Sequence, residues 1–146
     1  MFRLTLILSI ALSFVTALCT QQPSEKATSS YSSIPAEAAK QANPIKSSPE
    51  SLSRAKKWWN LDCAMCHGKN GDGKGELAAD MKLRIADFSV PNAFKDRTDG
   101  EIFYMIKIGN QDMPPEGQRV TPRENWDLVN YVRSLSKAKA TADQKQ

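Results

Sequence analysis

The sequence predicts an all-α domain with long loops. Two capping boxes, TDGE at 98–101 and TPRE at 121–124, each precede an apolar run with helical spacing. We find no run of useful length that alternates between apolar and polar residues, as a half-buried strand would. The loops at 68–97 and 109–121 are rich in Gly, Pro and polar residues. Loops of that length need something to pack around, which indicates a large prosthetic group within the core.

The first element, residues 1–18, is predicted to be a secretory signal peptide. Arg3 and the amino terminus supply positive charge, and an uncharged apolar run follows at 4–18. A membrane-spanning helix needs about 20 apolar residues, so this run is short for a span and has the length of a signal. The sequence therefore predicts an exported, periplasmic protein.

Cys19 directly follows this run and leaves two interpretations open. Bacterial lipoproteins carry a lipidated cysteine at this position, and a lone extra cysteine in an exported protein needs an explanation. Leu18, however, stands where such proteins usually have a small residue. The protein is either a lipoprotein with a membrane tether through Cys19 or a soluble exported protein.

Composition divides the rest of the chain into three parts. Residues 19–48 are rich in Ser, Ala, Gln and Pro, which predicts a flexible linker or tether. Residues 138–146 are predicted to be a disordered tail for the same reason. The folded domain is expected over 49–137.

Local signals place three helices in this domain. Ser48 followed by Pro49 predicts a helix start, and the helix should run to the first cysteine of a pair, Cys63. The second helix follows the box at 98–101, and Gly109 is expected to close it as a left-handed cap. The last helix follows the box at 121–124, and its apolar positions are Trp126, Leu128, Val129, Tyr131, Val132 and Leu135.

Cys63, Cys66 and His67 form a Cys-x-x-Cys-His motif, which is the attachment signature of c-type heme. Each thiol adds across one vinyl group of the heme, and His67, the sole histidine of the chain, then supplies an axial ligand to the iron. A zinc site needs four ligands, a thioredoxin-like pair needs a βαβ context, and a disulfide would leave the long loops unexplained. We therefore predict one covalently bound heme c.

The second axial ligand is predicted to be Met113. No other histidine exists, and a methionine thioether raises the redox potential. Met65 lies between the two cysteines, Met105 falls inside a predicted helix as a core residue, and Met81 follows the attachment site closely. Met113 lies in a loop stiffened by two prolines and far enough along the chain to reach the opposite face of the heme.

Residues 50–136 resemble a class I (monoheme) cytochrome c of the bacterial respiratory-chain type. The resemblance rests on CAMCHG, TDGEIFYMIKIGNQDMPP and ENWDLVNYVRSL, in that order. It implies about four to five helices around one covalently bound heme, with crossing N- and C-terminal helices. In this family Trp59 would pack against Tyr131, and Ala55 occupies the crossing position where glycine is frequent. Glu76 stands where many members have a proline near the acceptor for the other nitrogen of the heme histidine, so the acceptor for His67 must come from elsewhere.

The resemblance implies an electron carrier and not an enzyme. It would shuttle single electrons between periplasmic or membrane-bound complexes, from a respiratory donor to a terminal oxidase or reductase. Two alternatives remain: a heme subunit permanently docked in an oxidase or reductase complex, and a heme enzyme or gas sensor with an open iron site. A transient redox partner would dock near the heme edge, where Lys69, Lys74 and Lys107 are candidate contacts. The formal net charge of +4 comes without a lysine-arginine block, which disfavours nucleic acid as a partner.

Overall fold

The structure, a computed structural model, describes residues 34–110 and 112–143 of the 146-residue chain. The predicted signal peptide, Cys19 and the first half of the predicted linker lie outside the described residues. In chain order the helices are α1 (Ala36–Ala39), α2 (Pro49–Trp58), the π-helix η1 (Trp59–Cys63), α3 (Ala64–His67), α4 (Glu76–Asp80), α5 (Asp99–Ile108) and α6 (Pro122–Asp143).

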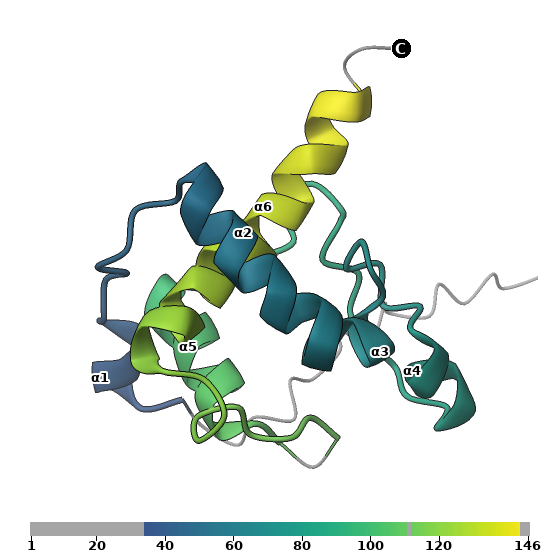
Figure 1. The fold of residues 1–146 in the computed structure, drawn as a ribbon, viewed down its shortest axis with the longest axis horizontal. Helices are drawn as coiled ribbons and strands as arrows, with labels where there is room; N and C mark the ends of the chain where they lie inside the picture. The colour runs from purple at the N-terminus through teal and green to yellow at the C-terminus, as the bar shows by residue number, and fades with distance from the viewer. Residues whose placement is uncertain (1–33, 111, 144–146) are drawn as a thin grey trace, which may run out of the picture.

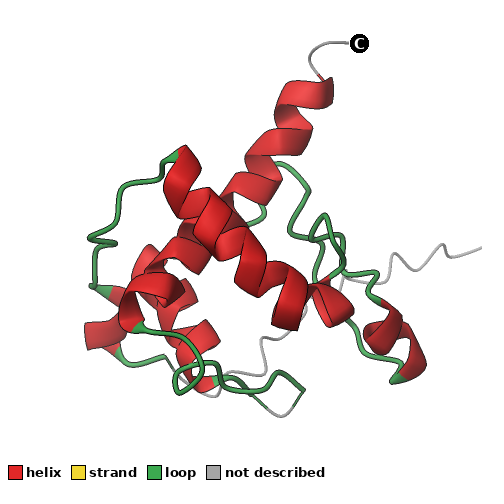
Figure 2. Cartoon of the chain, viewed as in Figure 1, coloured by secondary structure: helices red, strands yellow, loops and turns green. Residues whose placement is uncertain are grey.

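Every regular element in this part of the chain is helical, which confirms the all-α prediction (Figures 1 and 2). The elements α2, η1 and α3 follow one another without a break, so they form one continuous helical run. Across the described ranges, no helix has both the length and the apolar character needed to cross a membrane.

The helix that leads to the cysteine pair begins where the sequence predicts. The Ser48 side chain accepts a hydrogen bond from the Ser51 amide, and Pro49 occupies the first helical position. Beyond Trp58 the backbone widens into one π-helical stretch and then returns to α-helix up to His67. The π-helical stretch was not predicted, and such insertions are frequent at functional sites.

The capping box predicted at the start of α5 is confirmed. The Glu101 amide donates to Thr98 Oγ1 over 3.1 Å, and the Thr98 amide donates to Glu101 Oε2 over 2.7 Å. Gly109 ends the helix with φ +67° and ψ −165°. The positive φ agrees with the prediction, but this ψ lies outside the left-handed helical region, so the predicted left-handed cap is wrong in detail.

The second predicted capping box starts α6. The Thr121 amide donates to Glu124 Oε2 over 2.8 Å, and the Glu124 amide donates to Thr121 Oγ1 over 3.3 Å. The helix extends to Asp143 and so includes residues 138–143 of the predicted disordered tail. Alanine and lysine in this segment are strong helix formers, which favours continuation of the helix.

The expected crossing of the N- and C-terminal helices is that of α2 and α6 (Figure 1). Ala55 is fully buried at this crossing, and the rings of Trp59 and Tyr131 pack with their centroids 5.5 Å apart. Arg54 and Asp127 add a two-bond ion pair across the helices, at 2.8 and 3.0 Å. Because Asp127 is fully buried, loss of Arg54 would leave an uncompensated charge in this interface.

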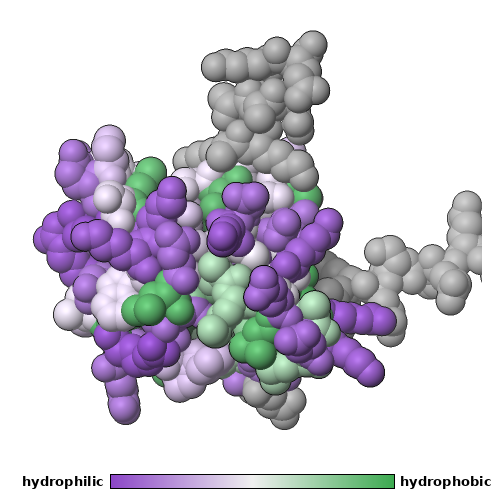
Figure 3. Space-filling model, turned by 45° about the vertical axis from the view of Figure 1, so that its right-hand side comes forward, coloured by the Kyte–Doolittle hydropathy of each residue, from purple (hydrophilic) through white to green (hydrophobic). Residues whose placement is uncertain are grey.

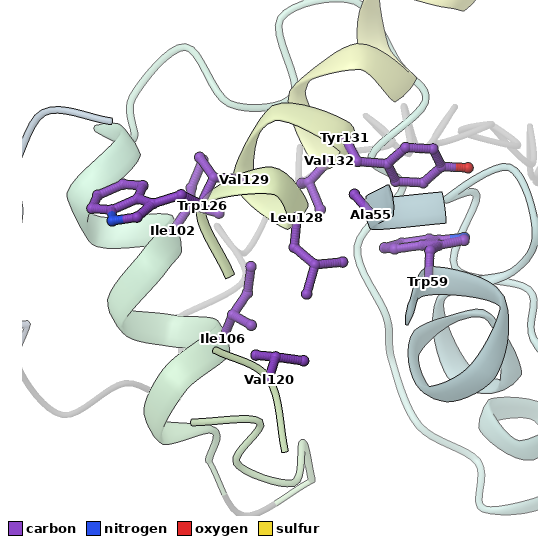
Figure 4. Close-up of a cluster of buried hydrophobic side chains, with 10 residues drawn as sticks. All are labelled: Ala55, Trp59, Ile102, Ile106, Val120, Trp126, Leu128, Val129, Tyr131 and Val132. Atoms are coloured by element: carbon purple, nitrogen blue, oxygen red, sulfur yellow. The ribbon is translucent and has the colours of Figure 1, made fainter. Parts of the chain in front are cut away.

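The apolar core lies between α2, α5 and α6 (Figure 4). In Figure 4, Leu128 of α6 points between Ile106 of α5 and Trp59. The buried members are Ala55, Trp59, Ile102, Ile106, Val120, Trp126, Leu128, Val129, Tyr131 and Val132.

Residues 34–48 lie against the helical domain, although the sequence places them in the flexible linker. The Asn43 amide nitrogen donates to the Trp126 carbonyl over 3.2 Å and to Asn130 Oδ1 over 3.0 Å. Asn130 in turn donates to the Ile45 carbonyl over 2.9 Å. The packed part of the chain therefore begins before residue 49.

Candidate functional site

A pocket opens between the cysteine-bearing helical run, the 81–97 loop, α5, the 109–121 loop and α6. It brings together three of the four predicted site residues, namely Cys63, His67 and Met113. The full lining consists of Trp59, Cys63, His67, Phe88, Phe94, Arg97, Ile102, Met105, Ile106, Met113, Leu128 and Val132. Because most of these side chains are apolar or aromatic, the pocket suits an apolar group, and His67 and Met113 add two side chains that can bind a metal.

Cys66, the fourth predicted residue, is half-buried on α3 but does not line this pocket. It is a free thiol, as is Cys63, so the pair does not form a disulfide. The glycine-containing loop packs tightly behind it, since the Gly75 amide donates to the Cys66 carbonyl over 3.1 Å. A Cβ atom at Gly75 would lie 2.2 Å from the Met65 carbonyl oxygen, so only glycine allows this close approach.

The Cys63 thiol is held in its neutral form. Burial raises the pKa of Cys63 to about 12, and the nearby carboxylates of Glu116 and Asp62 add to the increase. Because the reactive form of cysteine is the thiolate, a thiol with so high a pKa is not suited to be a nucleophile or a redox sensor at neutral pH. Its place on the wall of an apolar pocket fits attachment to a buried group.

His67 is also neutral. Burial lowers the pKa of its imidazole to about 4, and the neutral ring is the form that binds metals. The ring stacks on Phe88 with centroids 4.9 Å apart and lies 5.7 Å from the Trp59 ring. Trp59 is fixed in turn, because its Nε1 donates to the Lys69 carbonyl over 3.2 Å.

One ring nitrogen, His67 Nδ1, is buried without a hydrogen-bond partner among the described residues. The acceptor that the sequence leaves unnamed is therefore not identified in this part of the chain. A buried polar atom without a partner costs about 1–3 kcal/mol, which such a site normally recovers by binding a ligand or an ordered group.

Of the four methionines considered as iron ligands, two line the pocket. Met113 is half-buried in the 109–121 loop, and Met105 reaches the same pocket from α5. Met65 and Met81 point to solvent, with 51% and 56% of their surface exposed. The structure therefore places Met113 and Met105, but neither Met65 nor Met81, at the pocket.

Sequence reasoning missed the aromatic wall and the charged residue of the pocket. The Phe88 ring stacks on His67, and its centroid lies 4.9 Å from that of the Phe94 ring. Arg97 follows in the same loop. The only feature of the sequence that could have indicated this wall is the pair of phenylalanines in a polar stretch without helix signals. A second missed feature is the 2.7 Å ion pair between Arg119 and Asp62, which joins the loop that carries Met113 to the helical run that carries Cys63.

The residues present fit a heme. A neutral thiol, a neutral imidazole and a thioether face one apolar pocket, and the second thiol of the motif, that of Cys66, lies on α3 beside His67. Imidazole and thioether are donors that heme iron takes in c-type cytochromes, and the two thiols have the spacing of the attachment motif. Across the described ranges, no group of three or more His, Cys, Asp or Glu side chains is placed to hold a metal ion directly.

Comparison with known proteins agrees with this chemistry. The family described as cytochrome c oxidase, cbb3-type, subunit III matches residues 50–132, which is more than half of the chain. No curated protein matches the chain. A solved structure, the reducing HAO-like protein complex of Kuenenia stuttgartiensis, is similar with a TM-score of 0.52 and 24% sequence identity. The similarity covers 63% of this chain and 46% of that one, so the present chain spans about half the length of the solved one and shares its fold.

Proposed function

Because the chain belongs to the cytochrome c family described as cytochrome c oxidase, cbb3-type, subunit III, we propose that it carries single electrons through one heme c. In this proposal Cys63 and Cys66 hold the heme by thioether bonds, and His67 and Met113 ligate its iron. The observation that carries the proposal is the meeting of Cys63, His67 and Met113 at one apolar pocket, from two segments far apart in sequence.

The chain's own residues favour electron transfer over catalysis at the iron. When bound, the heme supplies a one-electron couple. His67 and Met113 would both ligate the iron, and apolar side chains such as those of Trp59, Phe88 and Leu128 line the pocket. Iron held by two protein ligands would leave no position for a substrate, and an apolar surrounding with a thioether ligand favours a high potential. A heme enzyme or gas sensor would need Met113 to leave the iron.

Two features of the surface support the proposal that the protein docks with redox partners. Lys69, Lys74 and Lys107 are exposed, and the apolar side chains of Leu61 and Met65 are also exposed along the heme-attachment run. Figure 3 shows one face of the molecule, on which small apolar groups are interspersed among polar residues. Exposed lysines and exposed apolar side chains are features that suit brief docking of an acidic partner.

A permanently docked subunit is the second candidate. It is favoured by the family description, which names a subunit of an oxidase, and by the solved relative, which is a protein complex. We propose an exported, periplasmic location for either form, and membrane anchoring by a lipid on Cys19 would serve both. Purification under mild detergent distinguishes them, because a docked subunit travels with other chains.

The test of the proposed function is to make the full chain together with heme-attachment machinery. We expect covalent heme that survives acid-acetone extraction, and a weak red absorption band from the ferric iron–thioether bond. Cys63→Ala combined with Cys66→Ala should leave the polypeptide without covalent heme.

Two variants distinguish Met113 from Met105 as the proposed iron ligand. Met113→Ala should lose the thioether band and bind carbon monoxide readily when reduced, whereas Met105→Leu should keep the band and exclude carbon monoxide. The opposite pattern would assign the ligand to Met105, and a colourless extracted wild-type polypeptide would refute the heme proposal altogether.

A further inference from the structure

Arg97 brings a permanent positive charge to the wall of a largely apolar pocket. It lies immediately before α5, in a different segment of the wall from Cys63. Its side chain is 35% exposed, so the guanidinium lies where the pocket meets solvent. A cation at such a position is costly unless an anion compensates it.

Arg97 has a side-chain partner within the domain, Glu101, but this contact leaves most of the hydrogen-bond donors of the guanidinium unused. Arg97 Nη1 donates to Glu101 Oε1 over 3.3 Å, which is longer than a usual charge-assisted bond. Glu101 is already engaged, since its other oxygen accepts from the Thr98 amide over 2.7 Å in the capping box. No further side-chain partner of the guanidinium is found among the described residues, although it has five N–H donors.

A heme would bring a second anion, to which the remaining donors of Arg97 can bind. It carries two propionate carboxylates on the porphyrin edge opposite the positions that attach to cysteine. An ionised carboxylate in apolar surroundings is unfavourable without a cation, and arginine matches carboxylate geometry with two parallel hydrogen bonds. Cys63 would hold one edge of the group, and Arg97 lies on a different segment of the wall, as contact with the other edge needs.

We propose that Arg97 binds a heme propionate and that Arg133 positions Arg97 for this role. The proposal rests on the proposed function, since it needs a heme in the pocket. Arg97 would then pair with the polar edge of the heme, and its positive charge favours the reduced iron.

Arg133 holds the segment that carries Arg97 from α6. Its Nη2 donates to the Arg97 carbonyl over 2.6 Å and its Nη1 to the Phe94 carbonyl over 3.3 Å. Its Nε pairs with Asp99 at the start of α5. Phe94 and Arg97 both line the pocket, so one guanidinium fixes two wall residues at once. Arg133 is thus a positioning residue that does not itself line the pocket.

The experiment uses the full-length heme-loaded protein and compares Arg97→Gln, Arg97→Lys, Arg133→Gln and the matched control Arg123→Gln, whose arginine is exposed on α6. Two properties are measured: the heme propionate bending mode in resonance Raman spectra, which reports hydrogen bonding to the propionates, and the midpoint potential. Arg97→Gln should shift the propionate mode and lower the midpoint potential, because a positive charge near the iron is lost.

The other variants distinguish an effect on propionate binding from an effect on the stability of the protein. Arg97→Lys should keep most of the potential but shift the mode, since a lysine cannot form the two-bond contact. Arg133→Gln should shift the mode in the same direction as Arg97→Gln by a smaller amount, whereas a purely structural Arg133 would lower the melting temperature and leave the mode unmoved. Arg123→Gln should change neither.

The inference is overturned if Arg97→Gln matches Arg123→Gln in both measurements while carrying covalent heme. That result leaves the proposed function intact, whereas absence of covalent heme in the wild type refutes the proposed function itself. Should Arg97→Gln fail to load heme, Arg97→Lys and Arg133→Gln decide the matter by the same two measurements.

Discussion

At the scale of single residues, burial determines the chemistry of the site. The Cys-x-x-Cys-His motif identifies Cys63 and His67 from sequence, but it does not indicate their protonation states. Burial raises the pKa of Cys63 to about 12 and lowers the pKa of His67 to about 4, so both side chains are neutral at physiological pH. This pair of states follows from the apolar lining that tertiary packing places around them.

Glu116 is an acidic residue that the same packing buries near Cys63. It is 5% exposed, and its Oε2 has no hydrogen-bond partner among the described residues. Burial raises the pKa of Glu116 above its ordinary value of 4.5, and the charge of Asp62 adds to this, while Arg119, at 3.6 Å, acts in the opposite direction. The folded state therefore disfavours the ionised form of Glu116.

This raised pKa predicts a pH-dependent effect of Glu116→Gln on stability. A group with a raised folded-state pKa destabilises the protein above that pKa, and the penalty disappears below the unfolded-state pKa. Glutamine resembles the neutral acid, so the variant should melt at a higher temperature than wild type at pH about 7. The gain should shrink as the pH falls toward 4.5, and calorimetry of the heme-loaded protein at both pH values measures it.

Asp112→Asn is the matched control, because Asp112 is an exposed acid in the same loop. Its effect should be small and nearly equal at both pH values. Equal gains for Glu116→Gln at neutral and acidic pH would contradict the raised pKa.

At the scale of elements, the 109–121 loop is shaped so that Met113 faces the pocket. Asn110 Oδ1 accepts from the Met113 amide over 2.8 Å, and the Met113 carbonyl accepts from the Asn110 amide over 2.8 Å. The Glu116 amide then donates to the Ile106 carbonyl over 3.0 Å, which ties the loop back to α5. The loop is thus held by local bonds at both ends of its methionine segment.

Gly109 starts this loop, and we expect its replacement to disturb the position of Met113. Gly109 has φ +67°, and a Cβ atom there would lie 2.3 Å from the Met113 carbonyl oxygen. Gly109→Ala must displace the methionine segment or strain the backbone, at a cost of about 1–3 kcal/mol. We expect a lower melting temperature together with a weaker ferric iron–thioether band, recorded in thermal scans and optical spectra.

Asp112→Ala serves as the control for this loop, since it alters an exposed side chain and leaves the backbone path open. It should retain the band. An undiminished band in Gly109→Ala would show that the turn does not govern the position of Met113.

At the scale of the whole molecule, the N-terminal segment is part of the folded unit. Ala38 of α1 is buried against α5, and Thr98 Oγ1 donates to the Ala39 carbonyl over 2.8 Å. Asn43 and Asn130 connect the segment to α6. Residues 34–48 therefore belong to the folded unit, although composition predicts a flexible tether over 19–48.

Asn43→Ala tests this attachment. The variant removes hydrogen bonds to the Trp126 carbonyl and to Asn130 Oδ1, and a partly buried acceptor left without a partner costs about 1–3 kcal/mol. We expect a clear drop in melting temperature with an unchanged heme spectrum. Lys46→Ala, at an exposed position in the same segment, should leave the melting temperature within experimental error, and the same result for Asn43→Ala would mean that the segment adds no stability.

The sequence by itself determined the local features of this protein. The helix starts at Ser48, Thr98 and Thr121 depend on residues within one turn, and all three were predicted correctly. The Cys63–His67 motif is equally local, because one helical turn sets the spacing of the two thiols. The contact of Trp59 with Tyr131 came from a family resemblance and is confirmed.

Tertiary structure decided what depends on distant partners. The ion pair of Arg54 with Asp127, the hold of Arg133 on the Arg97 carbonyl and the packing of residues 34–48 each join segments separated by dozens of residues. Composition cannot reveal such pairs, since each side chain alone looks like an ordinary surface group or a polar linker residue. The same holds for the pocket: sequence selected Met113 by elimination, and only packing showed that Met105 faces the same space while Met65 and Met81 face solvent.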